Sequence, residues 1–442
     1  MQELVQYHDC DEGWIITSSV VEKGARAETE SQRRRTVYCY NFDELLEETI
    51  DFSGYFEWLE NEVKSRSIHE CYIPLTCEYT ELDSRTNKLV AKSKYGKEDG
   101  WIDGYVDAWL HDHRKEHLSI LGEFGTGKTW FALHYAWHLL QDYFRAKDKK
   151  LPRHRVPIFI PLRDFSKAVE VETLISDFFF RKDKIQIQGA FSAFNQLNKM
   201  GKLLLIFDGF DEMSDKVDRQ KMIDNFWQLA TIISGKSKVI LTCRNEHFPQ
   251  IKEGRQLLNA ELKQTTKHLT GNAPQFEVVQ LLRFEPWQIE KLLSFHTDRT
   301  TVEKIMANEE LRDLLSRPIM TELVVDALDD IKQGKPIDMS RIYLYATKRK
   351  MERDIRQERT FTSLADKLYF LCELSWQMLS SNKLVINYKE FSDSVRGLFK
   401  HIEDKDIDYW RYDLRGQSLL VIDEEDGNYK PAHKSLLEFL LQ

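Results

Sequence analysis

"GEFGTGKT", residues 122–129, decides the fold, because its glycines, lysine and threonine stand between an apolar run and a helical pattern. The run "HLSIL" (117–121) predicts a strand, and "TWFALHYAWHLL" (129–140) predicts the helix that follows. A strand, the pattern G-x-x-x-x-G-K-T and a helix together are the context of a phosphate-binding loop. The stretch therefore predicts a nucleotide site rather than only a tight glycine turn.

The sequence predicts a role in phosphate binding for the residues of this loop. Gly122, Gly125 and Gly127 let the backbone curl so that N–H groups point at phosphate oxygens, aided by the positive end of the helix. Lys128 is predicted to reach the β- and γ-phosphates, and the Thr129 hydroxyl is predicted to ligate Mg²⁺. We expect the whole loop to contact the nucleotide: Gly122, Glu123, Phe124, Gly125, Thr126, Gly127, Lys128 and Thr129.

Acidic residues follow a second apolar strand, in "LLLIFDGFDE" (203–212). The strand predicts that Asp208 lies at the carboxyl end of the sheet, where ligands bind in open α/β folds, and holds Mg²⁺ directly or through water. Asp211 and Glu212 lie one short turn beyond and are predicted to orient or deprotonate an attacking water. The sequence leaves open which of the two is the base.

Arg244 ends another apolar run, "VILTCR" (239–244), which we expect to neighbour the other two strands. Its guanidinium is then placed to contact the γ-phosphate. The alternative is a plain surface arginine at a strand end. Further runs, "VPIFIPL" (156–162) and "FEVVQLL" (276–282), alternate with helical patterns, and this alternation predicts a parallel α/β sheet covered by helices.

The pattern changes along the chain predict five segments. Residues 83–100, "DSRTNKLVAKSKYGKEDG", are polar and nearly free of apolar periodicity, which predicts a linker. Residues 285 to about 355 are helical throughout, and "SLLVIDEE" and "GNYKPAH" are strand candidates joined by an Asp-Gly turn. We expect a partial α/β unit (1–82), a linker (83–100), a nucleotide-binding domain (101–284), a helical lid (285–360) and a winged-helix domain (361–442).

Composition limits the classes of partner and compartment. The 442 residues carry a net charge of −9, which argues against nonspecific nucleic-acid binding by the whole surface. The six cysteines form no C-x-x-C pair and no zinc spacing, so neither a disulfide framework nor a metal knuckle is predicted. No apolar run approaches a membrane span. We expect a soluble, cytoplasmic protein with no membrane partner.

The motifs together resemble the NACHT branch of the signal-transducing ATPases, the group that includes NOD-like receptors and bacterial antiphage relatives. The resemblance covers residues 100 to 442, and the Asp-Gly-Phe-Asp-Glu form of the strand end is its most specific element. It rests on the spacing of "GEFGTGKT", "VPIFIPLRDF", "LLLIFDGFDE", "VILTCR", "VVQLLRFEPWQIEKLL" and "LLSRPIMTELV".

The resemblance implies a fold of the AAA+/STAND type: a P-loop core, a helical lid and a winged helix. It also implies ATP, ADP and Mg²⁺ as ligands and an ADP-locked switch that forms a homo-oligomer when ATP binds. Pro318 in "SRPIM" matches the lid proline near the base and sugar, and His433 in "YKPAH" matches the winged-helix histidine that meets the ADP β-phosphate. The alternatives are a helix-breaking proline and a core histidine.

The N-terminal stretch that begins at Gly13 is similar to the last strands and helices of a restriction-endonuclease-like domain. Such nucleases hold their metal through an Asp and a Glu-x-Lys pair on earlier strands, and nothing before Gly13 is long enough to hold them. We expect no DNA cleavage by this chain, and DNA as a partner only through an effector missing at the N-terminus. The trigger is expected to be a ligand or protein sensed by a missing C-terminal region.

Three functions from different classes remain open. The leading hypothesis is a slowly hydrolysing regulatory ATPase that resets a signalling or antiphage assembly. The runner-up is an ATP-driven motor acting on nucleic acid, and the third is a scaffold that binds nucleotide without turnover. Turnover measured with and without DNA separates the three.

Overall fold

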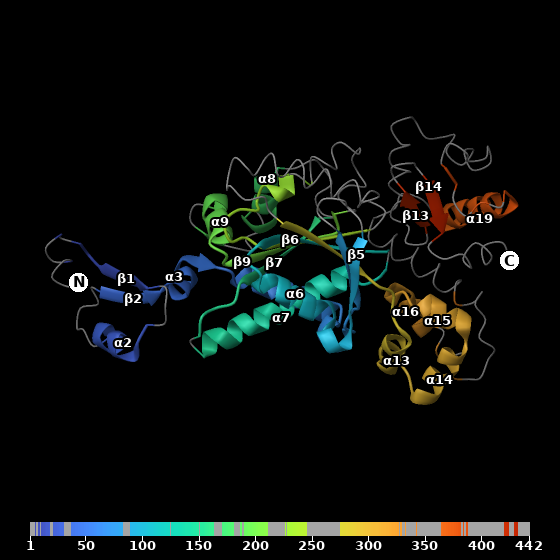
Figure 1. The fold of residues 1–442 in the computed structure, drawn as a ribbon, viewed down its shortest axis with the longest axis horizontal. Coiled ribbons are helices and arrows are strands. Elements are labelled where there is room, and N and C mark those ends of the chain that lie inside the picture. The colour runs from blue at the N-terminus through green and yellow to red at the C-terminus, as the bar shows by residue number, and fades with distance from the viewer. Residues whose placement is uncertain are drawn as a thin grey trace.

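The fold is that of a computed structural model, drawn as a ribbon in Figure 1. It describes residues 10–17, 21–30, 37–82, 89–123, 125–149, 151–162, 170–180, 186–187, 190–210, 228–244, 275–326, 364–381, 386–387, 420–423 and 428–431, with the single positions 5, 8, 226, 328, 332, 342 and 383. Four of the predicted site residues lie outside the described residues: Phe124, Asp211, Glu212 and His433.

A seven-stranded sheet forms the centre of the molecule, with the strand order β5-β4-β11-β6-β10-β9-β7. The five strands from β11 to β7 run parallel, as the alternation of apolar runs and helices predicts. Strands β7 and β9 are buried at every position, because helices cover both faces of the sheet. The strands are β4 (Cys77–Leu82), β5 (Leu89–Tyr95), β6 (Lys115–Gly122), β7 (Val156–Pro161), β9 (Leu203–Asp208), β10 (Val239–Arg244) and β11 (Gln275–Leu281).

The expected linker at residues 83–100 is wrong where the structure describes it. Residues Leu89–Tyr95 form β5, which pairs antiparallel with β4, and β4 pairs antiparallel with β11. An edge strand has one solvated face and carries charges, so it lacks the continuous apolar run that marks the buried strands. Here Lys92 and Glu78 form an ion pair across the two strands, with 2.6 Å between Nζ and Oε1. Strand β5 is therefore an edge of the central sheet, and β4 joins it to β11.

Helices pack on both sides of this sheet. Figure 1 shows α6 (Trp101–His111) and α7 (Lys128–Asp148) along one side, and α8 (Val171–Ile175) and α9 (Ala190–Lys199) on the other. A π-helix, Ser176–Phe180, continues α8. No helix within the described ranges is long and apolar enough to cross a membrane.

Residues 53–82 pack on the nucleotide-binding core, so the boundary expected at residue 82 is wrong. Helix α4 (Ser53–Ser65) buries Tyr55, Leu59 and Val63, which share one face, and α4 packs against α7. The Tyr55 hydroxyl accepts a hydrogen bond at 2.6 Å from the backbone N–H of Phe159 in the outermost strand, β7. This helix therefore covers an open edge of the sheet, which local pattern alone does not indicate.

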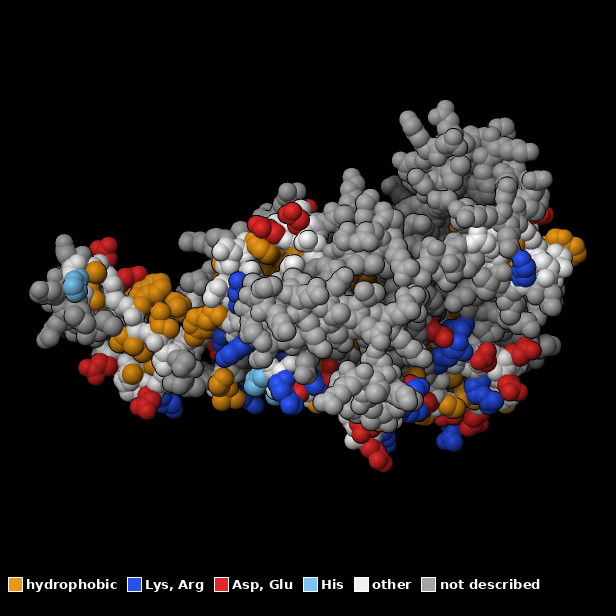
Figure 2. All heavy atoms as spheres, turned by 45° about the horizontal axis from the view of Figure 1, so that its top comes forward, with side chains coloured by type: hydrophobic (Ala, Val, Ile, Leu, Met, Phe, Trp, Pro, Cys, Tyr) orange, Lys and Arg blue, Asp and Glu red, His pale blue; other side chains and the backbone are white. Residues whose placement is uncertain are grey.

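The first elements form a small unit at one end of the molecule. Strand β1 (Gly13–Thr17), α2 (Lys23–Glu30), β2 (Val37–Asn41) and α3 (Phe42–Thr49) follow one another as expected, and β1 pairs parallel with β2. Strand β3 (Ile50–Asp51) pairs with β8 (Gln186–Ile187) and joins this unit to the core. Strand β1 exposes large apolar side chains, and Figure 2 shows hydrophobic side chains gathered at this end.

Short helices follow the sheet, as the sequence predicts for the residues that the structure describes up to 326. Their ends are set by caps: Asp298 accepts a hydrogen bond from the Thr301 N–H at 3.0 Å, and Asn308 accepts one from the Leu311 N–H at 3.0 Å. The helices are α13 (Pro286–Ser294), α14 (Arg299–Ala307), α15 (Glu309–Leu315), the 3₁₀ helix Pro318–Met320 and α16 (Thr321–Asp326).

The described C-terminal elements are one long helix and a small antiparallel sheet. Strands β13 and β14 pair as the two strand candidates predict, and β12 extends the sheet. The C-terminal elements are α19 (Leu364–Ser380), β12 (Ile386–Asn387), β13 (Leu420–Asp423) and β14 (Asn428–Pro431). One further helix, α5 (Ile68–Cys71), lies much earlier in the chain, between α4 and β4. The winged-helix assignment of residues 361–442 stays a prediction.

Candidate functional site

The glycine-rich loop connects β6 to α7 at the carboxyl end of the sheet, where the sequence places it. Gly127 has a φ of +97°, and its Cβ position lies 3.3 Å from a methyl group of Leu75, so a side chain there would be strained. A Cβ on Gly122 would lie 2.5 Å from the Thr126 hydroxyl. The loop can therefore close only with glycine at these positions.

The Lys128 ammonium lies inside this loop. Its Nζ donates to the carbonyl oxygens of Gly122 at 2.8 Å and Glu123 at 3.0 Å. The Thr126 hydroxyl donates to the same Glu123 carbonyl at 2.9 Å. The loop thus holds a positive charge at the start of α7, where the helix dipole is also positive.

Asp208, the last residue of β9, is hydrogen-bonded through both carboxylate oxygens. Oδ2 accepts from the Thr129 hydroxyl at 2.8 Å, and Oδ1 accepts from the Thr242 hydroxyl at 2.6 Å. Thr242 in turn accepts from the backbone N–H of Gly209 at 2.9 Å. Asp208 and Thr242 are both buried, so this chain of hydrogen bonds fixes the direction of the carboxylate. The structure thus brings together Thr129 and Asp208, the two residues that the sequence analysis assigns to Mg²⁺, and that assignment stays a prediction.

A cavity of about 480 Å³ opens over the loop, within the usual size range of small-molecule sites. Its lining includes six residues that the sequence singles out: Gly125, Gly127, Lys128, Thr129, Arg244 and Pro318. Arg244 lies beside the loop because its strand neighbour in the β10–β6 register is Gly122. Pro318 reaches the cavity from the short helices that follow the sheet. Residues separated by nearly 200 positions therefore meet at one site.

Several lining residues have no counterpart in the sequence predictions. Thr242 is one. The sequence feature that could have indicated it is a polar residue within an apolar strand, and it lies two positions before Arg244 and so on the same face of the strand. His296, from the connection after α13, is another. One wall comes from the segment between α4 and β4: Arg66, Ser67, Cys71, Tyr72, Ile73 and Leu75. That wall could not be read from sequence, because it depends on where α4 and α5 pack.

Glu123 connects the loop to the later helices. Its carboxylate accepts from Arg283 Nη2 at 2.8 Å and Nε at 3.1 Å, and it lies 3.5 Å from Arg317 Nη2. Arg283 follows β11, and Arg317 directly precedes Pro318. Arg317 is largely buried, and this burial lowers the pKa of its guanidinium. The loop and the helical segment are therefore joined by a charged contact.

Two family models match the chain. Residues 116–294 match the NACHT domain, and residues 1–47 match the NACHT-associated inactive Restriction Endonuclease 1. The chain is also 54% identical over 441 residues to an uncharacterized WD repeat-containing protein of Nostoc sp., an alignment that takes in 99% of this chain and 29% of that protein. The chain thus spans under a third of the length of this relative.

Solved structures with a similar backbone fold share little sequence identity with this chain. The Walker-type ATPase of Pyrococcus abyssi is 16% identical, with a TM-score of 0.36, and the match covers 78% of this chain and 95% of the Pyrococcus chain. The ORC1 protein of Aeropyrum pernix, solved in complex with DNA, is 15% identical, with a TM-score of 0.39, and covers 77% of this chain and 90% of its own.

Proposed function

Because the chain carries a NACHT domain at residues 116–294, we propose that it is an ATP-binding, slowly hydrolysing switch that assembles and disassembles with its nucleotide state. Its setting would be signalling or antiphage defence. The observation that carries the proposal is the contact of Thr129 with Asp208, next to Lys128, because Lys128 and Thr129 both line one cavity. An amine, a hydroxyl and a carboxylate in this order are the groups that hold a magnesium–nucleotide complex.

We assign the binding groups from this geometry. Lys128 would exchange its two carbonyl contacts for the β- and γ-phosphates, while Thr129 and Asp208 would hold Mg²⁺ between them. A bound Mg²⁺ would supply positive charge that offsets the charge of the phosphates. Arg244 would contact the γ-phosphate, and Pro318 would lie against the base and sugar. The proposal rests on sequence for Asp211 and Glu212 as catalytic acids. It also rests on sequence for His433 as a contact of the ADP β-phosphate.

The switch itself is supported by the contact of Glu123 with Arg283 and Arg317. A residue of the phosphate-binding loop is there paired with the arginine that precedes Pro318. A change in the loop on nucleotide exchange would alter this pairing and so the position of the lid. For residues 1–47 we propose a non-catalytic part, because the matched family is described as inactive.

Lys128→Ala tests the nucleotide site. We expect at least a tenfold loss of affinity for ATP with Mg²⁺ in isothermal titration, since each hydrogen bond from a charged group contributes about 1.5–3 kcal/mol. Lys149→Ala, at the exposed far end of the same helix, is the matched control and should bind as the wild type does. Equal affinity in the two variants would remove the assignment of Lys128.

The two alternative functions differ from the switch in turnover. A motor acting on nucleic acid should hydrolyse ATP faster when DNA is added, whereas a scaffold should bind ATP without measurable hydrolysis. A regulatory switch should show slow turnover that DNA leaves unchanged. Turnover of the chain with and without DNA, with Lys128→Ala as the blank, separates the three.

A further inference from the structure

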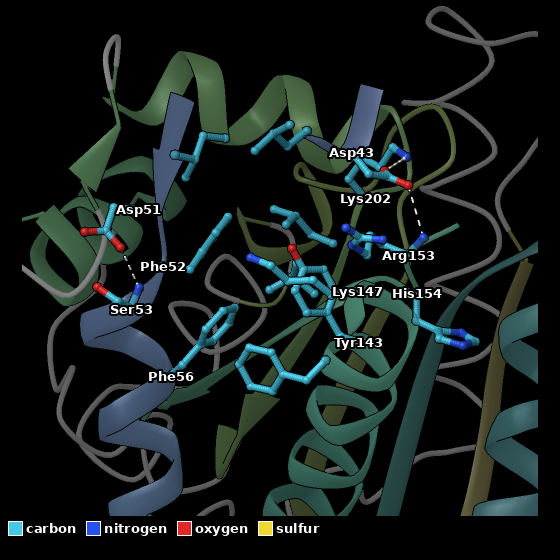
Figure 3. Close-up of a pocket in the computed structure, with 15 residues that line it drawn as sticks. Asp43, Asp51, Phe52, Ser53, Phe56, Tyr143, Lys147, Arg153, His154 and Lys202 are labelled. Carbon is cyan, nitrogen blue, oxygen red and sulfur yellow. Dashed lines mark hydrogen bonds and ion pairs between the residues drawn. The ribbon is translucent and has the colours of Figure 1, made fainter. Parts of the chain in front are cut away.

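Figure 3 shows a second cavity, of about 410 Å³. It lies at the opposite end of the parallel strands from the nucleotide cavity. Val156 and Leu203, which line it, are the first residues of β7 and β9, whereas the nucleotide cavity lies where the strands end. Its other walls come from α3, β3 and the start of α4 on one side and from the last turns of α7 on the other. The two cavities share no lining residue.

Aromatic rings make one side of this cavity. Phe56 stacks on Phe52 with 5.7 Å between ring centroids and lies edge-on to Phe144 at 5.4 Å. Tyr143 packs 6.0 Å from Phe56, with its ring buried. Offset and edge-on arrangements of this kind are also how proteins hold a bound aromatic ring.

Hydrogen-bond donors enter the cavity beside these rings. Figure 3 shows Tyr143 and Lys147 reaching from α7 toward the middle of the cavity. The two residues are four positions apart and therefore lie on one face of the helix. An ammonium and a phenolic hydroxyl above an aromatic side favour a ligand that is both ring-shaped and negatively charged.

The two carboxylates that line the cavity are engaged elsewhere. Asp43 forms an ion pair with Lys202 and accepts from the backbone N–H of Arg153 at 3.1 Å. Asp51 accepts at 2.8 Å from the backbone N–H of Ser53, at the start of α4. Against these two carboxylates the lining carries three cationic side chains, Lys147, Arg153 and Lys202, so its net charge is positive.

From this arrangement we propose that the second cavity binds a small aromatic anion, such as an aryl phosphate or an aryl carboxylate. Its ring lies against Phe52 and Phe56, and its anionic group accepts from Lys147 and Tyr143. The ligand contacts the start of α4 and the end of α7, so binding strengthens the packing of these two helices on each other. Helix α7 carries Lys128 at its first residue and Lys147 near its last, and thus links the two cavities.

The test is isothermal titration of the chain with 1-naphthyl phosphate and 1-naphthoate, with inorganic phosphate and neutral 1-naphthol as comparison probes. The titrations are repeated in Lys128→Ala, so that any binding at the phosphate-binding loop is separated from binding at the second cavity. We expect one saturable site for at least one of the two aryl anions in both proteins. Phosphate alone and 1-naphthol should each bind at least tenfold more weakly, because each supplies only half of the contacts.

Two variants locate the site. Lys147→Met should weaken binding of the aryl anion about tenfold, whereas Lys149→Met, on the same helix end but outside the cavity, should leave it unchanged. Phe56→Leu tests the aromatic side, with circular dichroism to check that the variant is folded. The proposal is overturned by the absence of saturable binding for both aryl anions, or by equal binding in Lys147→Met and Lys149→Met.

Discussion

Both oxygens of the Asp208 carboxylate accept hydrogen bonds from threonine hydroxyls on neighbouring elements. One of these partners, Thr129, follows from the loop motif, because the residue after the lysine is the expected metal ligand. The other, Thr242, belongs to no motif. Its hydroxyl both donates to Asp208 and accepts from Gly209, so it orients the carboxylate that the metal would contact.

Thr242→Val removes this hydroxyl at nearly constant volume. The buried Asp208 oxygen and the Gly209 N–H each lose a partner, so we expect the free energy of unfolding to fall by about 1–3 kcal/mol in urea titrations. We also expect weaker Mg²⁺-dependent binding of ATP. Thr242→Ser keeps the hydroxyl and is the control; if Thr242→Val matches it in stability and in Mg²⁺ dependence, Thr242 has no orienting part.

At the scale of elements, the strands that the sequence predicts best are those buried on both faces. Strands β6, β7, β9 and β10 are short apolar runs, and the hydrophobic effect alone places them inside. Strand β5 carries three consecutive polar and exposed residues, Lys92, Ser93 and Lys94, and half of β4 is polar, so their composition is close to that of a loop. Their place depends on pairing with β11, which lies almost 200 residues later.

Lys238, just before β10, shows how one side chain fixes the connection between elements. Its ammonium donates to the carbonyl oxygens of Trp109 at 2.8 Å, Asp112 at 2.7 Å and Lys115, and it lies 4.4 Å from the centre of the Trp109 ring. These carbonyls belong to the end of α6 and to the connection into β6. Carbonyl groups at the end of a helix lack partners within the helix.

Lys238→Met should therefore lower the free energy of unfolding by about 2–4 kcal/mol, because one buried and two partly buried carbonyls lose a charged donor. Lys236→Met, two residues earlier and exposed, is the matched control. Urea unfolding followed by tryptophan fluorescence measures both. A loss below 0.5 kcal/mol in Lys238→Met, roughly the range of surface substitutions, would contradict a structural part for Lys238.

At the scale of the whole molecule, α6, α7 and the segment before β4 meet at a half-buried polar cluster. The Tyr72 hydroxyl donates to Asp103 at 3.3 Å, the His134 Nε2 lies 3.7 Å from Asp103, and the Tyr72 and His134 rings stack at 3.6 Å. Burial raises the pKa of Asp103 to about 7 and lowers the pKa of His134 to about 4. Tyr72 also lines the nucleotide cavity, so this cluster supports its wall.

The two shifts have opposite effects on stability. Between about pH 4 and 7 the folded state keeps a proton on Asp103 that the unfolded chain has lost. The contribution of this group to the free energy of unfolding therefore falls as pH rises. Between about pH 6.5 and 4 the unfolded chain binds a proton on His134 that the folded state excludes, so this group destabilises the fold as pH falls. In the wild type the two partly cancel over their common range.

Asp103→Asn removes the first effect and leaves the second. We expect the stability of the variant relative to the wild type to rise from pH 4 to pH 7, by up to about 1 kcal/mol per pH unit. Urea unfolding at pH 5 and pH 7.5 measures this, with the exposed Asp148→Asn as control. A difference between variant and wild type that is the same at both pH values would mean that Asp103 is ionised throughout.

The sequence by itself determined the strand–loop–helix unit, the buried parallel strands and the placing of Lys128, Thr129, Asp208 and Arg244 at one end of the sheet. These follow from local periodicity and from glycine conformation, because each signal lies within a few residues. The tertiary structure alone decided the β4–β5 edge, the Tyr72 wall, the Thr242 contact and the second cavity. These depend on contacts between residues far apart in the chain, such as Glu123 with Arg283, and burial and pairing over such separations are set only when the packed elements come together.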